Sequence, residues 1–190
     1  MTVFEYASGL ISIVIGLAVA RVLGGIGTFI VARDRSFSDW TVAAWCVALV
    51  FVLVGWWMIG WIVLSGLTEL AFITLFLWVV ASALLYLGAF VLLPGGVIGG
   101  AGDPREHLQP LRAAFYFCLA GHFGVVFLVV LFRGVGGGWG AVNVGILAAL
   151  SAAGATARSS RGHALHLGIF LIWIAASVSQ TVRTIGDAGP

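Results

Sequence analysis

Lysine is absent from the sequence, and charged residues of any kind are scarce among its 190 positions. The nine basic residues are all arginine and only seven residues are acidic, so 8% of the chain is charged, against about 25% in soluble domains. Without lysine, the chain cannot form a Schiff base with retinal or pyridoxal phosphate, and it has no Walker-type phosphate loop. The net charge of +2 is also too small to indicate nucleic-acid binding.

Cysteine and catalytic motifs are equally sparse. Cys46 and Cys118 both lie in apolar segments, which indicates buried free thiols and not a disulfide framework. The sequence contains no HExxH, CxxC or phosphate-loop motif, and nothing in it indicates a Ser-His-Asp triad. We therefore predict that the protein is not an enzyme and that it binds no cofactor.

Histidine gives only a weak indication of a haem or metal site. A haem held by two histidines needs a second histidine at the depth of His122, whereas His163 and His166 lie nearer the end of their segment. His107 could join those two histidines at one end of the molecule, but only if their loops converge. We therefore predict no haem and no metal centre.

Apolar residues, in contrast, make up 62% of the chain. With so few charged side chains the chain could not cover a water-facing surface, and we predict an integral membrane protein. Each membrane-spanning helix needs about 20 apolar residues. Six segments meet or approach this length: 6–31, 41–64, 70–93, 111–132, 140–157 and 164–182. We expect residues 1–190 to form a single transmembrane domain, an all-α six-helix bundle whose halves allow a 3+3 arrangement.

Arginine is distributed unevenly between the two sides of this bundle. The loops after the first, third and fifth segments hold six arginines and the opposite side holds two: Arg33, Arg35, Arg105, Arg112, Arg158 and Arg161, against Arg133 and Arg183. Because cytoplasmic loops carry the excess of basic residues, both termini are predicted to face away from the cytoplasm. The N-terminus has neither a basic region nor a cleavage site, so we expect the first helix to be retained.

Tryptophan is common at membrane surfaces, where its ring is apolar and its N–H finds water or headgroups. The second segment carries tryptophans toward both of its ends. We expect aromatic belts there, formed by Trp40 and Trp45 at one end and by Trp56, Trp57 and Trp61 at the other.

Small residues recur every fourth position through the first segment. The row consists of Ser8, Ser12, Gly16, Ala20, Gly24 and Thr28. Small side chains let a second helix approach closely, which drives helix association in lipid. The row therefore predicts a helix-packing face, with the partner helix either in this chain or in another one.

Arg21 is the most informative of the polar residues predicted to lie inside the membrane. It lies near the centre of the first segment, where an unpartnered charge would cost roughly 2.5–3.5 kcal/mol. Since no carboxylate is at a matching depth, we expect Arg21 to bind backbone carbonyls, aromatic faces, water or an anion, with Tyr86 as a candidate partner. His122, at the midpoint of the fourth segment, is expected to be a hydrogen-bonded core residue or a proton relay.

The last segment carries a polar and aromatic stripe at spacings of three and four residues. Its members are His163, His166, Phe170, Trp173, Ser177 and Gln180. Such a seam points into a bundle or a wet cavity and not toward lipid. The residues that could line a polar pathway or bind a ligand are therefore Arg21, Tyr86, His122, His166, Trp173, Ser177 and Gln180.

Four short motifs in the first 120 residues resemble a group of small bacterial multi-pass inner-membrane proteins without an assigned function. They are Phe4-Glu5-Tyr6 before the run ISIVIGLAVARVL, the pair Trp56-Trp57, Tyr86 followed by Leu92-Leu93-Pro94, and the segment from Arg112 to Phe117. The resemblance implies a multi-pass protein of the bacterial inner membrane, whose termini the arginine bias places in the periplasm. It implies no activity, and no functional residue can be carried over from it.

Two functions fit these features. We expect a non-catalytic accessory or scaffold subunit that assembles through the small-residue face with other membrane subunits or with copies of itself. The alternative is a small transporter or channel for an anion or a neutral polar solute, with Arg21 and His122 lining its pathway. Membrane lipid is a partner in either case, and nucleic acid in neither.

Overall fold

The apolar segments fold as helices because backbone amide and carbonyl groups inside a bilayer must bond to each other, and an α-helix satisfies them within one segment. The computed structural model describes residues 3–31, 40–65, 72–93, 104–133, 137–156 and 160–187. Within these ranges there are six helices and no strand: α1 (Val3–Val31), α2 (Trp40–Ser65), α3 (Phe72–Leu92), α4 (Pro104–Arg133), α5 (Gly137–Gly154) and α6 (Ser160–Asp187). The predicted all-α, six-helix fold is confirmed.

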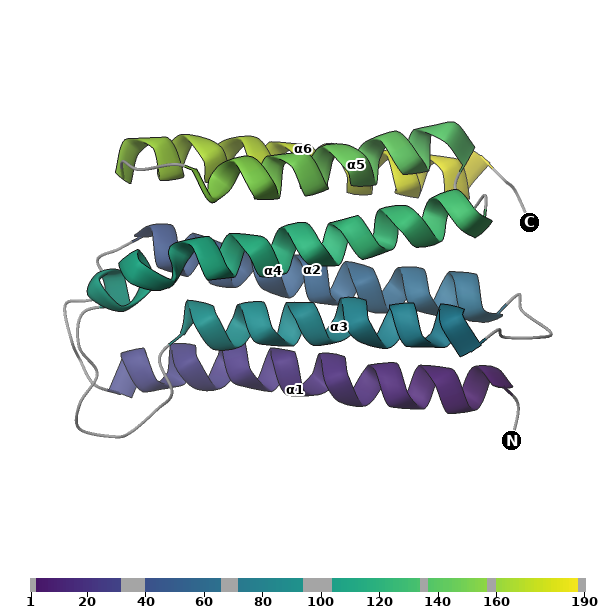
Figure 1. Cartoon of the computed structure of the whole chain (residues 1–190), viewed down its shortest axis with the longest axis horizontal. Coiled ribbons are helices and arrows are strands. Elements are labelled where there is room, and N and C mark those ends of the chain that lie inside the picture. The colour runs from purple at the N-terminus through teal and green to yellow at the C-terminus, as the bar shows by residue number, and fades with distance from the viewer. Residues whose placement is uncertain are drawn as a thin grey trace.

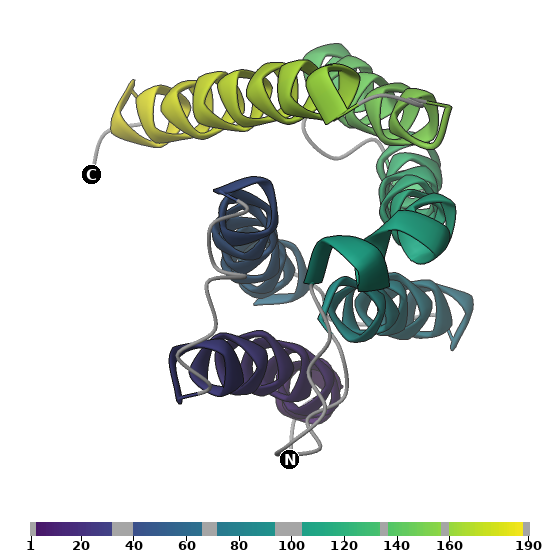
Figure 2. The same cartoon turned by 90° about the vertical axis from the view of Figure 1, so that its left-hand side faces the viewer.

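The helices form an arc around one central helix. Consecutive helices run in opposite directions along the long axis, so α1 begins and α6 ends at the same end of the molecule (Figure 1). Seen down that axis, α1, α3, α4, α5 and α6 follow one another around the arc, and α2 lies inside it (Figure 2). The packing agrees, since α3 lies between α1 and α4, while α2 contacts α1, α3 and α6. The last helix, α6, runs obliquely to the others (Figure 2).

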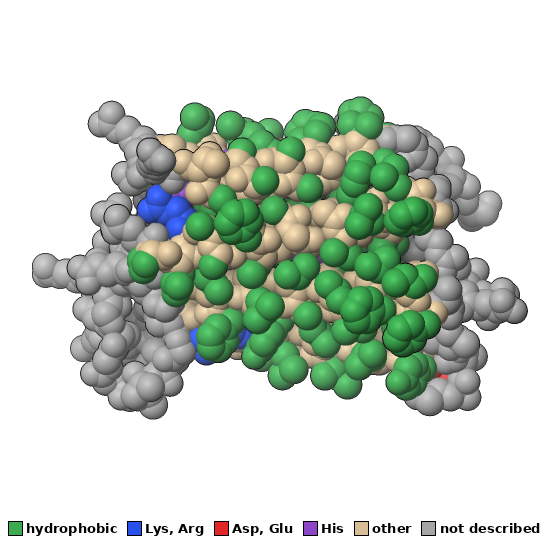
Figure 3. Space-filling model, in the orientation of Figure 1, with side chains coloured by type: hydrophobic (Ala, Val, Ile, Leu, Met, Phe, Trp, Pro, Cys, Tyr) green, Lys and Arg blue, Asp and Glu red, His purple; other side chains and the backbone are tan. Residues whose placement is uncertain are grey.

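Four of the helices can cross a membrane by length and composition. The qualifying segments are Glu5–Gly27 in α1, Thr41–Trp61 in α2, Phe72–Leu92 in α3 and Pro110–Phe132 in α4. The described apolar parts of α5 and α6 are shorter, at Trp139–Gly154 and Gly162–Ser177. Hydrophobic side chains cover the sides of the helices (Figure 3), as expected for a surface that faces lipid.

The two described arginine side chains, Arg21 and Arg112, lie toward the end of the molecule where α1, α3 and α5 finish (Figure 3). We call this end the arginine end. Apart from Arg112, the arginines that predicted the orientation lie outside the residues whose side chains are described. The compartment on each side of the bundle therefore stays a prediction.

Two helices, α4 and α6, are longer than the sequence predicted by more than one turn. We expected the fourth helix to begin at about residue 111, whereas α4 begins at Pro104. Proline suits a first helical turn because its missing amide would be unbonded there anyway. Pro110 lies further inside α4, where it removes one backbone hydrogen bond. In the same way, α6 extends beyond the predicted 164–182, because a helix can continue past the apolar segment that defines a span.

The predicted tryptophan belts are only partly present. Trp57 and Trp61 are exposed on the lipid-facing surface, as a belt requires. Trp45 and Trp56, in contrast, are only 2% and 3% exposed. Both belong to the face of α2 that points into the arc, so they are core residues and the belt prediction was wrong for them.

Candidate functional site

Six aromatic and histidine side chains from α2, α4 and α6 form a cluster toward the arginine end. We call it the Trp45 cluster; it consists of Trp45, Phe115, Tyr116, His163, His166 and Phe170, all of them buried. The Trp45 ring stands edge-on to Phe115 and Tyr116, at centroid distances of 5.1 and 5.5 Å. These large side chains join α2 to α4 and α6. The cluster therefore connects the central helix α2 to two helices of the arc.

Tyr116 is the polar centre of the Trp45 cluster. Its hydroxyl is hydrogen-bonded to His163 Nδ1 at 3.1 Å, and the two rings are stacked at 5.7 Å. The C-terminal end of α5 meets the same ring through Gly154. A Cβ atom at Gly154 would lie 2.4 Å from Tyr116 Cε1 and 2.8 Å from His166 Nε2. Only glycine fits at this position, and its backbone fills the space beside His166.

A second buried group lies deeper in the bundle, between α2, α3 and α4. His122 Nδ1 lies 2.9 Å from the carbonyl oxygen of Ala81 on α3. Since a carbonyl only accepts hydrogen bonds, Nδ1 must carry the proton and donate it. His122 is thus a buried side chain hydrogen-bonded to another helix, which is one of the roles expected for it.

Tryptophan completes this second group. Trp56 Nε1–H donates to Ser82 Oγ at 2.9 Å, and Ser82 in turn donates to the carbonyl of Trp78. The Trp56 and Trp78 rings are stacked at 4.0 Å, and the His122 ring stands edge-on to Trp56 at 5.1 Å. Trp78 and Ser82 were missed from the sequence, because a tryptophan and a serine in an apolar helix give no signal of the face they occupy.

A third polar group joins α5 to α6. Trp173 Nε1–H donates to Asn143 Oδ1 at 2.6 Å, and Ser177 Oγ–H donates to the same oxygen at 2.8 Å. Ser177 also lies 2.7 Å from the Trp173 carbonyl, within its own helix. The stripe on α6 therefore faces inward along its described length, from His163 to Ser177. The side chain of Gln180 lies outside the described residues.

Arg21 lies apart from these three groups, at the outer edge between α1 and α3. Its Nη2 donates to the carbonyl oxygen of Leu93 at 3.0 Å, and its guanidinium carbon lies 4.7 Å from the centre of the Phe90 ring. A backbone carbonyl and an aromatic face were among the expected partners. Tyr86 is half-buried against the core and is not in contact with Arg21 among the described interactions.

The middle of the small-residue row of α1, from Gly16 to Gly24, faces away from the bundle. The buried face of α1 is formed by Ala7, Ile11, Ile15, Ala18, Val22 and Gly25. Gly16, Ala20 and Gly24 lie on the opposite, exposed face, and a Cβ atom at Gly16 meets nothing within 4 Å. Earlier in the row, Ser12 accepts a hydrogen bond from Trp57 on α2, and Ser8 donates to the Glu5 carbonyl within α1. The side chain of Thr28 is outside the described residues.

The structure therefore separates the residues that were expected to line one polar pathway. Arg21 is at the α1–α3 edge, His122 is between α2, α3 and α4, and His166 is in the Trp45 cluster. Among the described side chains, no three histidines, cysteines or acidic residues are grouped so that they could hold a metal ion. The side chain of His107, the third histidine of the metal hypothesis, is not among them.

No protein-family model matches the chain, and no curated protein or solved structure is significantly similar to it.

Proposed function

We propose that this chain is a non-catalytic membrane subunit that assembles with another transmembrane helix through the small-residue face of α1. One observation carries the proposal. The part of the row from Gly16 to Gly24 is exposed, opposite the face that packs against α2 and α3. The partner helix would come from a second copy of the chain or from a different subunit.

Lipid contact alone does not account for small residues at these positions. In lipid, helices associate by close van der Waals packing, and small residues are enriched where two backbones approach each other. Exposed Leu17 and Leu23 flank the row on either side of Ala20, and we call the strip of small residues between them the groove. Small residues between larger ones let a second helix approach closely.

The alternative function, a transporter or channel for an anion or a neutral solute, receives less support. A pathway requires polar side chains that follow one another through the membrane. Here each group of polar residues forms hydrogen bonds across a separate contact between two helices: His122 to Ala81, Tyr116 to His163, and Asn143 to Trp173. These contacts favour a scaffold whose interior polar groups hold helices together.

We further propose that the subunit belongs to a bacterial inner membrane, with both termini in the periplasm. The four apolar helices that are long enough to span support insertion into a membrane. The excess of arginine in the loops after α1, α3 and α5 supports the orientation.

Photo-crosslinking in native membranes tests the assembly. A photoreactive residue at Ala20 should give a protein adduct of defined mass, whereas the same residue at Ile172, exposed on α6, should give lipid adducts alone. Mass spectrometry then identifies the partner as a second copy or as a foreign subunit, and either result supports the proposal. Lipid adducts alone at both positions would contradict it.

A pair of leucine substitutions provides an independent test. Gly16→Leu should reduce the crosslink at Ala20 because the leucine fills the groove. Gly168→Leu on α6 is the matched control, since a Cβ atom at Gly168 also has no neighbouring atom within 4 Å. Equal crosslinking in both variants would mean that the groove is not the contact surface.

A further inference from the structure

We infer that Arg21 binds the phosphate of a membrane phospholipid at the headgroup level, on the periphery of the bundle and not in its interior. The inference is independent of the proposed assembly, which concerns the outward groove of α1. It rests on where Arg21 lies along the membrane normal, on which side of the bundle it lies, and on which of its donors are already used.

The depth of Arg21 follows from the pairing of α3 with α4. Gly88 on α3 lies opposite Cys118 on α4. Five further residues along α3 lead to Leu93, and six residues back along α4 lead to Arg112, so these two positions are level. Arg21 bonds to Leu93 and is therefore at the same level. From the sequence we had placed Arg21 near the centre of the membrane; the structure places it beside the last residue before Pro94, at the end of α3.

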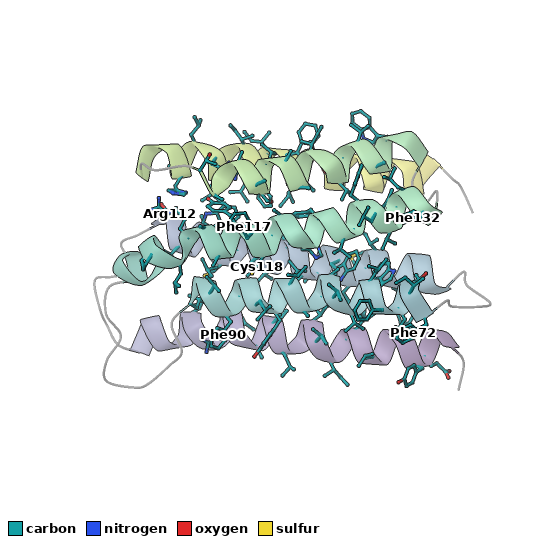
Figure 4. The ribbon with its side chains drawn as sticks, in the orientation of Figure 1. Phe72, Phe90, Arg112, Phe117, Cys118 and Phe132 are labelled. Carbon is teal, nitrogen blue, oxygen red and sulfur yellow. The ribbon has the colours of Figure 1, made fainter. Side chains whose placement is uncertain are left out.

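This level is consistent with one boundary of the hydrocarbon layer. From Arg112 to Phe132, α4 rises about 30 Å, which equals the usual thickness of that layer. Figure 4 shows Phe90 toward the same end as Arg112, and Phe72 and Phe132 at the other end. Arg21, through its contact with Phe90, thus lies near this boundary, where its side chain can reach lipid phosphates.

The lateral position of Arg21 turns it toward lipid. Phe90, whose ring the guanidinium covers, is 51% exposed on the outer surface of α3. Leu17, one turn before Arg21 on α1, is also exposed. The three buried polar groups, around Tyr116, His122 and Asn143, lie between other pairs of helices. An anion that reaches Arg21 therefore comes from the surrounding bilayer surface and not from a path through the bundle.

The remaining donors of Arg21 suit a phosphate. A guanidinium has five N–H donors, and one of them, on Nη2, is used by the Leu93 carbonyl. The Nε atom has no hydrogen-bond partner among the described residues, and because it is buried a lipid cannot reach it. Glu5 is the one acidic side chain that the structure describes, and it lies at the start of α1, far from Arg21. The Leu93 bond and the Phe90 ring together hold the guanidinium, and the remaining donors on its two Nη nitrogens can bind phosphate oxygens in a bidentate pair.

Native mass spectrometry of the full-length protein tests the inference, with titration of phosphatidylglycerol in detergent. Arg21→Gln keeps a polar amide without the charge, so it should stay folded and bind the lipid about tenfold or more weakly. Arg112→Leu is the matched control: it removes the other arginine of the same level and should leave that affinity within about twofold if the site is local to Arg21. Arg21→Lys should fall between wild type and Arg21→Gln, because it keeps the charge without the bidentate geometry.

The outcomes separate the sources of phosphate. Unchanged lipid binding in Arg21→Gln overturns the inference, and so does an equal loss in Arg21→Gln and Arg112→Leu, which would indicate general charge attraction. Inorganic phosphate serves as the competing probe. Displacement of the lipid at millimolar phosphate would assign Arg21 to a soluble anion and overturn the lipid assignment. Loss of the Ala20 crosslink concerns the assembly alone and leaves this inference unaffected.

Discussion

At the scale of single residues, the polar side chains of this protein act as links between helices. An unsatisfied polar group in an apolar interior is costly, so each such group needs a partner, and the partner is often on another helix. Two serines show the difference between local and long-range bonding. Both are fully buried and both donate to the carbonyl four residues earlier, Ser82 to Trp78 and Ser151 to Leu147. Only Ser82 also accepts a hydrogen bond from another helix, through Trp56.

Ser82→Ala should lower the free energy of unfolding by about 1 kcal/mol, because the Trp56 N–H loses its acceptor in a buried site. Ser151→Ala should cost markedly less, since it removes a bond within one helix. Unfolding of both variants in a mild detergent, followed by circular dichroism, measures the difference. Equal costs would show that the bond between α2 and α3 contributes nothing.

Gly154→Ala should destabilise the protein by about 1–3 kcal/mol, because the added methyl group overlaps the Tyr116 ring and His166 Nε2. Gly168→Ala is the control: its Cβ meets open space, and alanine favours the helix, so its stability should change by less than about 1 kcal/mol. Thermal unfolding of the two variants gives the comparison. A Gly154→Ala protein as stable as wild type would mean that α5 does not approach Tyr116 this closely.

At the scale of helices, the weakest attachment is that of α6. It crosses the others obliquely and is held by the Trp45 cluster at one end and by Asn143 further along (Figure 2). In lipid there is little hydrophobic gain from helix contact, so such polar and aromatic bonds carry more of the attachment than they would in a soluble protein. The opposite case is α1, whose apolar face packs into the bundle while its small-residue face stays open.

Asn143→Leu should loosen α6, because one amide oxygen accepts both the Trp173 and the Ser177 bonds. We expect a loss of about 1–2 kcal/mol and faster hydrogen exchange along α6, with α1 to α4 unchanged. Ser177→Ala removes one of the two bonds and should have a smaller effect. If exchange in α6 stays at the wild-type rate in the folded Asn143→Leu protein, the α5–α6 contact is maintained by other residues.

At the scale of the whole molecule, the alternation of six helices places the start of α1 and the end of α6 at one end of the bundle (Figure 1). The arginine bias predicts that this end faces away from the cytoplasm. The arginine level, marked by Arg21 and Arg112, then lies at the cytoplasmic headgroups. Anionic lipids attract basic residues to that surface.

Single cysteines fused to the two ends of the chain, in a background with Cys46→Ala and Cys118→Ala, should react from the same side of the membrane. A membrane-impermeant thiol reagent added to intact cells should label both, because an even number of helices returns the chain to its starting side. A cysteine at Arg33, after α1, should be protected until the cells are opened. Labelling of the two ends from opposite sides would show that one of the shorter helices, α5 or α6, does not cross.

Much of the site could not be predicted from the sequence, for a physical reason. A tryptophan near a helix end fits both a membrane belt and a core, and in the sequence these two readings are identical. Trp45 and Trp56 were placed in the belt, whereas the structure buries them among Tyr116, Phe170 and His122. The depth of Arg21 in the membrane could not be predicted for a similar reason. The sequence gives its position along α1, but its depth relative to the other helices depends on where α3 ends beside it.

The all-helical class of this protein follows from its amino-acid pattern alone. Six apolar segments with few charges favour a helical bundle in a membrane, because every backbone polar group there must be bonded within its own segment. The pattern also determined the row of small residues on α1 and the inward stripe on α6, since helical periodicity alone places residues on a common face. Which helix faces meet is seen only in the folded arrangement. It turned the row from Gly16 to Gly24 outward and divided the polar residues among separate helix contacts, because burial of a helix face depends on neighbours that lie far away in the chain.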